Sequence, residues 1–350
     1  MQAITASIFV FGLMIIFHEL GHFILAKAAG IKVHEFSVGF GPKLFGLPRG
    51  ETAYNLRLFP LGGFVRMAGM DPGEKVELEE TGSFSKKPIW QRMLVIAAGS
   101  LMNFLLAILI LALIFMTQGL PVLTPEGIPR LTTVIDKLVP GGPAEKAGLL
   151  PGDKVIAING QETNDWLKMT EIINARPEQQ ITLTVSRAGQ RREIQVVPLR
   201  DEQGRGKIGI YPVQETKRLN LFSALATGTK YTIQVIALIV NFLGQMIFGQ
   251  APADLGGPVR IVWEINQAAA MGIFNLLQLT AFLSINLGLL NLFPIPALDG
   301  SRLLFLTVEW FRGRPVDPAK ENFIHLVGFG LLLLLIVVIT YNDVLQLFQK

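Results

Sequence analysis

Two histidines and a glutamate near the amino terminus have the types and spacing that metal-assisted hydrolysis requires. They form the HExxH sequence His18-Glu19-Leu20-Gly21-His22. Residues four apart lie on one face of a helix, so both imidazoles can hold one Zn²⁺ ion. Zinc lowers the pKa of a bound water to about 7, and the intervening glutamate can accept its proton as general base. The motif therefore predicts a zinc hydrolase with His18 and His22 as ligands and Glu19 as base.

The apolar setting of this motif argues against a chance match. A charged group at the centre of a bilayer costs about 2.5–3.5 kcal/mol on insertion scales, and such groups are by default functional. The apolar run has no basic segment at its start and no small-residue cleavage site, and it continues to about Ala29. We therefore expect an uncleaved membrane helix and not a signal peptide.

A catalytic zinc needs a third protein ligand and an open position for water. The chain has no Cys, which excludes thiolate ligands, and Ala28 stands where a metzincin would have its third histidine. Asp299 is the strongest candidate, because it closes an apolar segment after two helix-breaking prolines. Helix capping is its alternative role. By residue type alone, other side chains stay open as ligands: Glu35, Glu51, His34 and His325.

The composition of the chain is that of a polytopic membrane protein. Half of the 350 residues are hydrophobic and 17% are charged, whereas soluble domains average about 25% charged residues. Four segments approach the ~20 apolar residues that a crossing needs: 4–27, 92–117, 276–298 and 324–342. The net charge of +4 comes from basic residues that lie largely beside these segments, which fits membrane orientation and not nucleic-acid binding.

A fifth apolar stretch, residues 223–249, is predicted to lie on the membrane surface. Polar residues recur along one side of it: Thr227, Lys230, Gln234, Asn241 and Gln245. If this stretch crossed the membrane, Asp299 would lie on the face opposite the histidines. We therefore expect a membrane α-helical fold with four transmembrane helices and an interfacial amphipathic helix at 219–250.

Two segments have the character of β structure. Residues 52–59 and 63–67 flank a Pro60-Leu61-Gly62 break, which predicts a β-hairpin within the 30–91 segment. From 127 to 200, short strands surround a helix-like stretch at 166–175, and the string from Pro140 to Gly160 resembles the PDZ domains of bacterial proteases. Because PDZ domains usually bind peptides by strand addition, a peptide or substrate is a candidate ligand of this α+β domain, and guarding access to the site is its alternative role.

Basic residues give the predicted orientation. They gather in the 28–91 segment (Lys32, Lys43, Arg49, Arg57, Arg66, Lys75, Lys86 and Lys87) and in the 300–322 loop (Arg302, Arg312, Arg314 and Lys320). The positive-inside tendency places both segments in the cytoplasm. The PDZ-like domain is then expected outside, between the two halves of a membrane core at 1–117 and 251–350.

The HELGH sequence, the string Asn291-Leu-Phe-Pro-Ile-Pro-Ala-Leu-Asp299-Gly300 and the PDZ-like domain between them together resemble the site-2 protease family of intramembrane zinc metalloproteases. The resemblance is closest to the bacterial branch that acts in regulated intramembrane proteolysis, and it covers nearly the whole chain. It implies zinc bound by His18, His22 and Asp299, with Glu19 as base. It also implies the bacterial cytoplasmic (inner) membrane as the location, with the active site toward the cytoplasm.

The resemblance further implies how a transmembrane substrate is held. Asn286 and Asn291 are expected to contact it, although from the residues alone they could equally join helices. The segment Gly62-Gly63-Phe64-Val65 corresponds to a membrane-entering β-loop that pairs with substrate as an added strand, and an ordinary ribbon is its alternative. Typical clients of the family are membrane-bound anti-sigma factors and remnant signal peptides.

Two features depart from the family pattern. In the string Ala98-Gly99-Ser100-Leu-Met-Asn103, which resembles the second-span motif, Ser100 stands where proline is common. A single PDZ domain is present where enterobacterial members have two. Two other classes stay open beside the protease: a catalytically inactive membrane PDZ scaffold, and a metal transporter, which would need a ladder of intramembrane ligands.

Overall fold

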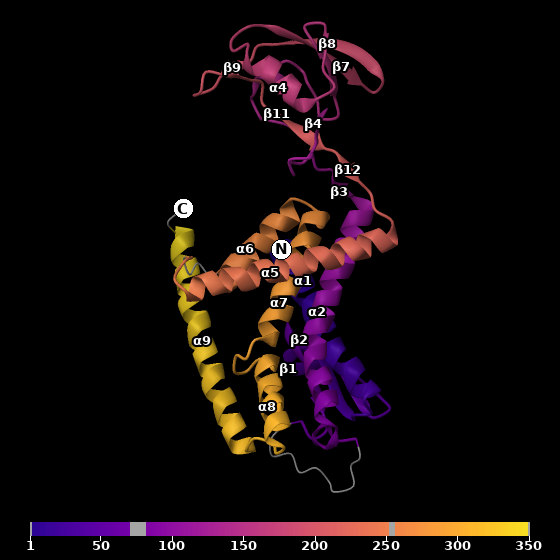
Figure 1. The fold of residues 1–350 in the computed structure, drawn as a ribbon, viewed down its shortest axis with the longest axis vertical. Helices are drawn as coiled ribbons and strands as arrows, with labels where there is room; N and C mark the ends of the chain where they lie inside the picture. The colour runs from indigo at the N-terminus through magenta and orange to yellow at the C-terminus, as the bar shows by residue number, and fades with distance from the viewer. Residues whose placement is uncertain (1, 71–81, 252–255, 349–350) are drawn as a thin grey trace. The chain divides into compact units, whose positions relative to one another are not determined.

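The computed structural model describes residues 2–70, 82–251 and 256–348 (Figure 1). It comprises two compact units. Residues Met1–Met116 and Asn220–Lys350 form one, here called the helical unit, and Thr117–Leu219 form the other, here called the β unit. Of the basic residues counted above, Lys75 lies outside the described residues.

The helical unit is built mainly from seven α-helices among the residues described. Their bounds are α1 Gln2–Ala28, α2 Ile89–Thr117, α5 Leu221–Ile247, α6 Pro258–Ala270, α7 Ile273–Leu292, α8 Asp299–Arg312 and α9 Pro318–Phe348. Within this described part, five are long and apolar enough to cross a membrane: α1, α2, α5, α7 and α9. Length and composition alone therefore do not separate the predicted surface helix α5 from the other four.

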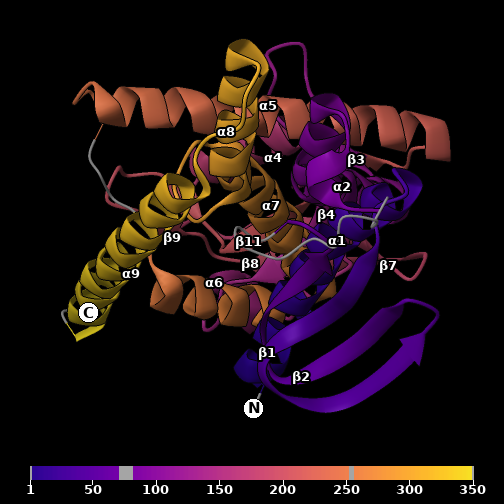
Figure 2. The same cartoon turned by 90° about the horizontal axis from the view of Figure 1, so that it is seen from below.

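The direction of α5 differs from that of its neighbours. Figures 1 and 2 both show it running across the ends of α2 and α7, whereas α2 and α7 run alongside each other. The crossing with α2 is close, because a Cβ added at Gly228 would lie 3.0 Å from the backbone oxygen of Ile108. This crosswise course is the one that an interfacial helix would take.

The segment predicted as a crossing at 276–298 ends earlier as a helix. α7 stops at Leu292, and α8 starts at Asp299. Pro294 and Pro296 have no backbone N–H and cannot continue the helical bonding, so the chain between them is free to bend. The bend brings Asp299 to the first position of a new helix.

The predicted β-hairpin was wrong in its turn. The two arms expected at 52–59 and 63–67 belong to one long strand, β2 (Thr52–Met67), which pairs antiparallel with β1 (Val33–Arg49). The turn lies at Gly50-Glu51, where Gly50 has a left-handed φ of 62°. The break after Pro60, with Gly62 at φ 125°, redirects β2 so that 63–66 as well as 53–56 pair with residues 35–38.

A shared core joins this hairpin to the helices. Its buried apolar residues come from α1, β1, β2, α2 and α8, from the connection between α1 and β1, and from the short 3-10 helix Phe84–Lys86: Ala26, Ile31, Val33, Met67, Phe84, Val95, Ile96 and Leu306. Figure 2 shows β1 and β2 beside α1 at the edge of the helical unit. This core fixes the carboxyl end of α1 against β1, β2, α2 and α8.

The β unit has a sheet of its own. The strands are β4 (Leu131–Leu138), β5 (Lys154–Ile158), β7 (Ile181–Arg187), β8 (Gln190–Val196) and β11 (Ile210–Gln214), in the order β11-β4-β5-β7-β8, with β6 (Gln161–Glu162) beside β5. Two short pairs join β9 (Leu199–Arg200) with β10 (Gly206–Lys207) and β3 (Leu120–Pro121) with β12 (Thr216–Lys217). The helices are α3 (Pro143–Lys146) and α4 (Trp166–Asn174). The sheet therefore extends beyond residue 200, where the sequence suggested that the domain ends.

Candidate metal centre

The two motif histidines project from one face of α1, as their spacing predicts. Their Nε2 atoms lie 3.3 Å apart. The Nδ1 atom of His22 lies 2.8 Å from the backbone oxygen of Val95 in α2. Because a carbonyl oxygen only accepts, this bond places the proton of His22 on Nδ1 and leaves Nε2 with a free lone pair.

Asp299 joins these histidines from the opposite end of the sequence. Its Oδ2 atom lies 3.2 Å from Nε2 of His18 and 3.1 Å from Nε2 of His22. Gly300 makes this placement possible, because a Cβ there would come within 2.0 Å of the backbone oxygen of Phe293. The structure thus brings together the three residues that the sequence proposed as metal ligands.

The three ligand atoms, Nε2 of His18, Nε2 of His22 and Oδ2 of Asp299, are placed to bind one cation. Asp299 Oδ2 is buried and has no hydrogen-bond donor among the described residues. A tetrahedral zinc with bonds near 2.1 Å separates its ligand atoms by about 3.4 Å, close to the 3.1–3.3 Å found here. Two imidazoles and a carboxylate are also a ligand type of catalytic zinc sites. The arrangement fits zinc in both chemistry and spacing.

Electrostatics keep the carboxylate ready for a cation. Burial raises the pKa of Asp299, but the neighbouring His18 and His22, when their imidazoles carry a second proton, outweigh burial through hydrogen bonds and charge and hold that pKa well below its usual range. Asp299 is therefore ionised at neutral pH.

Glycines let α1 and α2 cross closely enough for this geometry. A Cβ on Gly21 would lie 2.2 Å from the backbone oxygen of Ala98. A Cβ on Gly99 would lie 2.4 Å from Nε2 of His22 and 2.7 Å from Cε1 of His18. No role was predicted for Gly99 beyond its place in the second-span motif, and its lack of a side chain is the signal in the sequence that a close helix contact could have been expected there.

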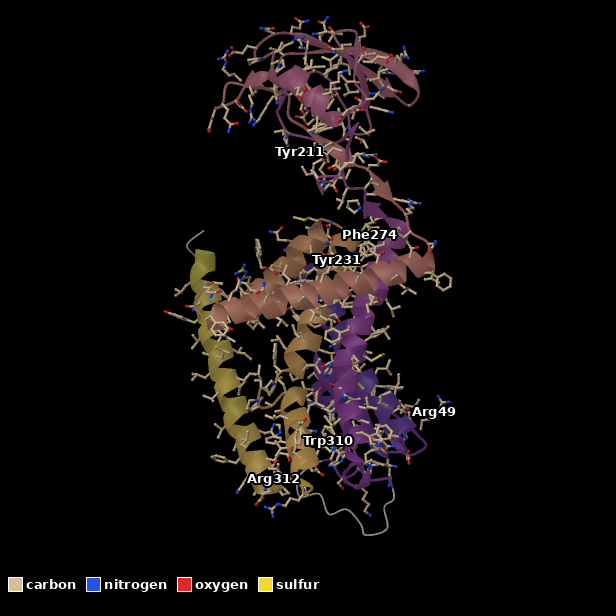
Figure 3. All side chains as sticks on the ribbon, in the orientation of Figure 1. Arg49, Tyr211, Tyr231, Phe274, Trp310 and Arg312 are labelled. Carbon is tan, nitrogen blue, oxygen red and sulfur yellow. The ribbon has the colours of Figure 1, made fainter. Side chains whose placement is uncertain are left out.

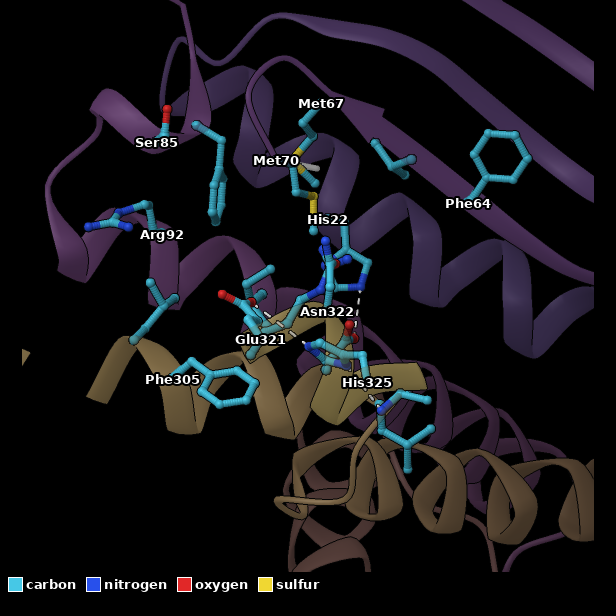
Figure 4. A pocket seen from close by; sticks show the side chains of 18 of the residues that line it. His22, Phe64, Met67, Met70, Ser85, Arg92, Phe305, Glu321, Asn322 and His325 are labelled. Carbon is cyan, nitrogen blue, oxygen red and sulfur yellow. Dashed lines mark hydrogen bonds and ion pairs between the residues drawn. The ribbon is translucent and has the colours of Figure 1, made fainter. Parts of the chain in front are cut away.

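Glu19 is among the residues that line a cavity of about 1110 Å³ beside the metal ligands. Figure 4 shows this cavity from close by. Within the described residues Glu19 has no hydrogen-bonded or ion-paired partner, so its carboxylate is free to act on a small molecule. A Cβ on Gly63 of β2 would lie 2.9 Å from Glu19 Cγ. The strand β2 therefore passes directly against the candidate base.

The strand segment predicted to pair with substrate borders this cavity. Gly63, Phe64 and Val65 line it, whereas Gly62 is not among its lining residues. Residues 63–66 pair with 35–38 of β1, and no strand of the described chain pairs with their other edge. One edge of this segment is thus open to a further strand.

A buried polar network stiffens the hairpin behind that edge. Glu35 Oε1 accepts hydrogen bonds from Ser37, Asn55 and Arg57. Burial raises the pKa of Glu35, but these bonds together lower it to about 2. The Arg57 guanidinium also lies over the Phe64 ring, 5.1 Å from its centre. Glu35 is thereby committed to the hairpin and is not a metal ligand.

The structure also places the remaining candidates. Glu51 pairs with Lys27, and His325 accepts a hydrogen bond from the backbone N–H of Ala297, 3.2 Å away. Neither joins the cluster of His18, His22 and Asp299, which is the group of potential ligands found among the described residues. His34 is likewise outside it.

The two asparagines of α7 lie away from the cavity lining. Asn286 donates to the backbone oxygen of Phe282 in its own helix. Asn291 is buried. Neither is among the residues that line the cavity, and their contact with substrate stays a prediction.

The chain is similar to known proteins over nearly its whole length. The model of peptidase family M50 matches residues 6–335. The zinc metalloprotease RasP of Geobacillus kaustophilus is 37% identical, with 99% of each chain covered. The regulator of sigma-W protease RasP of Bacillus subtilis is 35% identical over 99% of each chain, and the probable protease eep of Enterococcus faecalis is 33% identical over 99% of this chain and all of its own. The chain belongs to peptidase family M50.

Family membership agrees with what the motif predicted. The expected enzyme class, a zinc metalloprotease of the site-2 type, is confirmed, as is zinc as the cofactor. The long apolar helices agree with the predicted class of multi-pass membrane protein. Among solved structures, the PDZ domain of the SdrC-like protein from Listeria innocua is similar to 25% of this chain and 99% of its own, at 19% identity and a TM-score of 0.22.

Proposed function

We propose that this M50 peptidase hydrolyses peptide bonds within or next to the transmembrane segments of single-span proteins, with zinc held by His18, His22 and Asp299. The observation that carries the proposal is the convergence of three ligand atoms beside Glu19 in a cavity bordered by an open strand edge. When bound, the metal supplies a Lewis acid that polarises a carbonyl group and acidifies water.

Glu19 acts as the general base and then as an acid. Its carboxylate has no competing partner among the described residues, so it can take the proton from the attacking water. It then delivers this proton to the amine nitrogen that leaves when the peptide bond breaks. A positioned base of this kind contributes about 10²–10⁴ to the rate.

A helical substrate must be locally unwound before its carbonyl groups can react, because intrahelical bonds occupy them. The open edge of residues 63–66 offers backbone partners to an extended segment, and strand addition of this kind supplies binding without dependence on side-chain identity. Gly62, Gly63, Phe64 and Val65 are thus assigned to substrate binding. Asn286 and Asn291 are assigned the same role from the family resemblance.

The proposed substrates are membrane-bound anti-sigma factors or remnant signal peptides. The name of the Bacillus subtilis relative, regulator of sigma-W protease, supports the first of these. The β unit is proposed to be a PDZ domain that contacts a peptide or the substrate.

The location proposed is the bacterial cytoplasmic (inner) membrane, crossed by α1, α2, α7 and α9, with α5 in the interface. The basic residues support one orientation, since Arg49 of the hairpin turn and Arg312 of α8 lie toward the same end of the helical unit (Figure 3). That end is proposed to face the cytoplasm, with the metal centre on its side and the β unit outside.

The test is cleavage of a single-span substrate by detergent-purified protein and by its Glu19→Gln variant. We expect the variant to bind zinc as wild type does and to lose about 10²–10⁴ of the rate. Equal cleavage by both proteins would return the alternative of an inactive scaffold.

A further inference from the structure

One face of α2, the second helix of the membrane core, contacts both histidines. Val95, Gly99 and Asn103 are spaced by four residues, so they lie on one face of α2. The Val95 carbonyl bonds His22, and Gly99 lies against both rings. Asn103, at the other end of this face, has its side-chain amide 3.2 Å from Nδ1 of His18.

The Asn103 side chain is fully buried, and its Oδ1 atom has no partner as the amide is oriented. In that orientation the nitrogen, Nδ2, faces the imidazole. The positions of the two amide atoms are interchangeable, since heavy atoms alone do not distinguish them. Which atom faces His18 must therefore be settled by chemistry.

The two orientations give His18 different tautomers. If the amide nitrogen donates to Nδ1, the ring proton is on Nε2, and no lone pair faces Asp299 and His22. If the amide oxygen accepts from Nδ1–H, Nε2 is free, as it is in His22. A histidine that binds metal needs this second tautomer, with its other ring nitrogen donating to a fixed acceptor.

We propose that Asn103 is a positioning residue whose amide oxygen accepts a hydrogen bond from Nδ1–H of His18, fixing that ring as a metal ligand. The position of Asn103 is held at its backbone, because its carbonyl oxygen accepts a 2.8 Å hydrogen bond from Ser284 Oγ of α7. A side chain that positions another residue needs such a fixed backbone. α2 thus supplies one acceptor to each histidine, a main-chain oxygen for His22 and a side-chain oxygen for His18.

This inference rests on the proposed zinc ligands, and its test measures metal affinity, not activity. The zinc dissociation constant of the full-length protein in detergent is determined by competition with a chelator of known affinity. Asn103→Leu keeps the approximate shape and removes the acceptor, so we expect affinity to fall by about 10- to 100-fold. Asn103→Asp offers an oxygen that only accepts when ionised, so we expect it to retain wild-type affinity or to exceed it.

The Asp variant decides the role even if the Leu variant fails to fold. A tenfold or greater loss of affinity in folded Asn103→Asp protein would overturn the acceptor role, as would wild-type affinity in Asn103→Leu. Ser100→Ala is the matched control, since Ser100 is also buried on α2 but its backbone oxygen faces Gly288 of α7. It should bind zinc as wild type does, and an equal loss there would show that α2 is merely disturbed.

The result for wild type separates this inference from the proposed function. If folded wild-type protein binds no zinc, the ligand set itself is wrong and the role of Asn103 falls with it. If wild type binds zinc and all Asn103 variants match it, only the present inference is overturned.

Discussion

Arg92 and Glu309 form a two-pronged ion pair between the first turn of α2 and the last turn of α8. The Arg92 Nη1 and Nη2 atoms lie 3.0 and 2.6 Å from the two carboxylate oxygens of Glu309, and both side chains are less than 15% exposed. α8 begins with Asp299, so this pair ties the helix that carries the third ligand to the helix that backs the histidines.

Replacing Glu309 with Leu should leave the Arg92 guanidinium buried without its partner. Loss of one member of a buried pair costs about 3 kcal/mol or more, and α8 would lose its anchor. We expect a lower free energy of unfolding in detergent micelles together with weaker zinc retention.

The control for that change is Glu264→Leu in α6. Glu264 pairs with Arg260 at the surface, where the two side chains are 39% and 41% exposed. Exposed pairs contribute about 0–1 kcal/mol, so its stability should stay close to wild type. Equal losses in the two variants would refute a special role for the Arg92–Glu309 pair.

Gly99→Ala should displace both imidazoles, because the new Cβ would lie 2.4 Å from Nε2 of His22. We expect zinc affinity to fall by at least about tenfold, which is the smaller of the losses typical when residues around metal ligands are changed. Gly12→Ala on α1 is the matched control, since its Cβ would meet nothing within 4 Å. Gly12→Ala should be neutral or stabilise the protein by about 0.5–1 kcal/mol. Unaltered zinc binding by Gly99→Ala would contradict the close contact between α1 and α2 at the histidines.

Gly63→Ala should separate the base from the metal ligands. The added Cβ would lie 2.9 Å from Glu19 Cγ and 2.9 Å from the backbone oxygen of Ser37, so either Glu19 or the strand must move. Cleavage of a single-span substrate is expected to fall by up to about 10²-fold, with zinc content unchanged. Full activity in this variant would show that β2 does not bear on the base.

The β unit should lose stability in acid through Asp153. Burial raises the pKa of Asp153, but hydrogen bonds from Arg187 and from the Leu150 backbone N–H lower it by more than burial raises it. The pKa therefore lies below its ordinary value. A group with a lowered pKa stabilises the fold above its unfolded pKa, about 3.9, and this stability is lost as the pH falls through the folded pKa.

Thermal melting of residues 117–219 between pH 7 and pH 3 checks this expectation. The unit has its own buried core of twelve apolar residues, so we expect the fragment to fold alone. Asp153→Asn should flatten the pH dependence without abolishing it, because Asp201 also has a lowered pKa. A variant as acid-sensitive as wild type would assign the effect to other carboxylates.

The parts of the site that follow a local rule could be predicted from the sequence. His18 and His22 are one helical turn apart, and Asp299 follows two prolines at the end of an apolar segment. The contacts of Gly99 and Asn103 could not be predicted in this way. α2 is apolar around most of its circumference, so no periodicity indicates which face meets α1.

The turn of the β1–β2 hairpin is a second feature that could not be predicted from the sequence. Pro60 and Gly62 do mark a break, but they redirect a strand and do not form the turn, which lies at Gly50-Glu51. Only the pairing of residues 35–38 with two parts of β2 distinguishes these outcomes. Pairing between segments distant in sequence depends on the whole fold and not on local residue preference.

Zinc content tests the central claim most directly. Wild-type and Asp299→Ala proteins are purified in detergent, and bound zinc is counted per chain before and after treatment with a chelator. We predict one zinc per wild-type chain, and loss of most of that zinc from Asp299→Ala under the same treatment. Full zinc retention with full cleavage activity in Asp299→Ala would contradict the three-residue site.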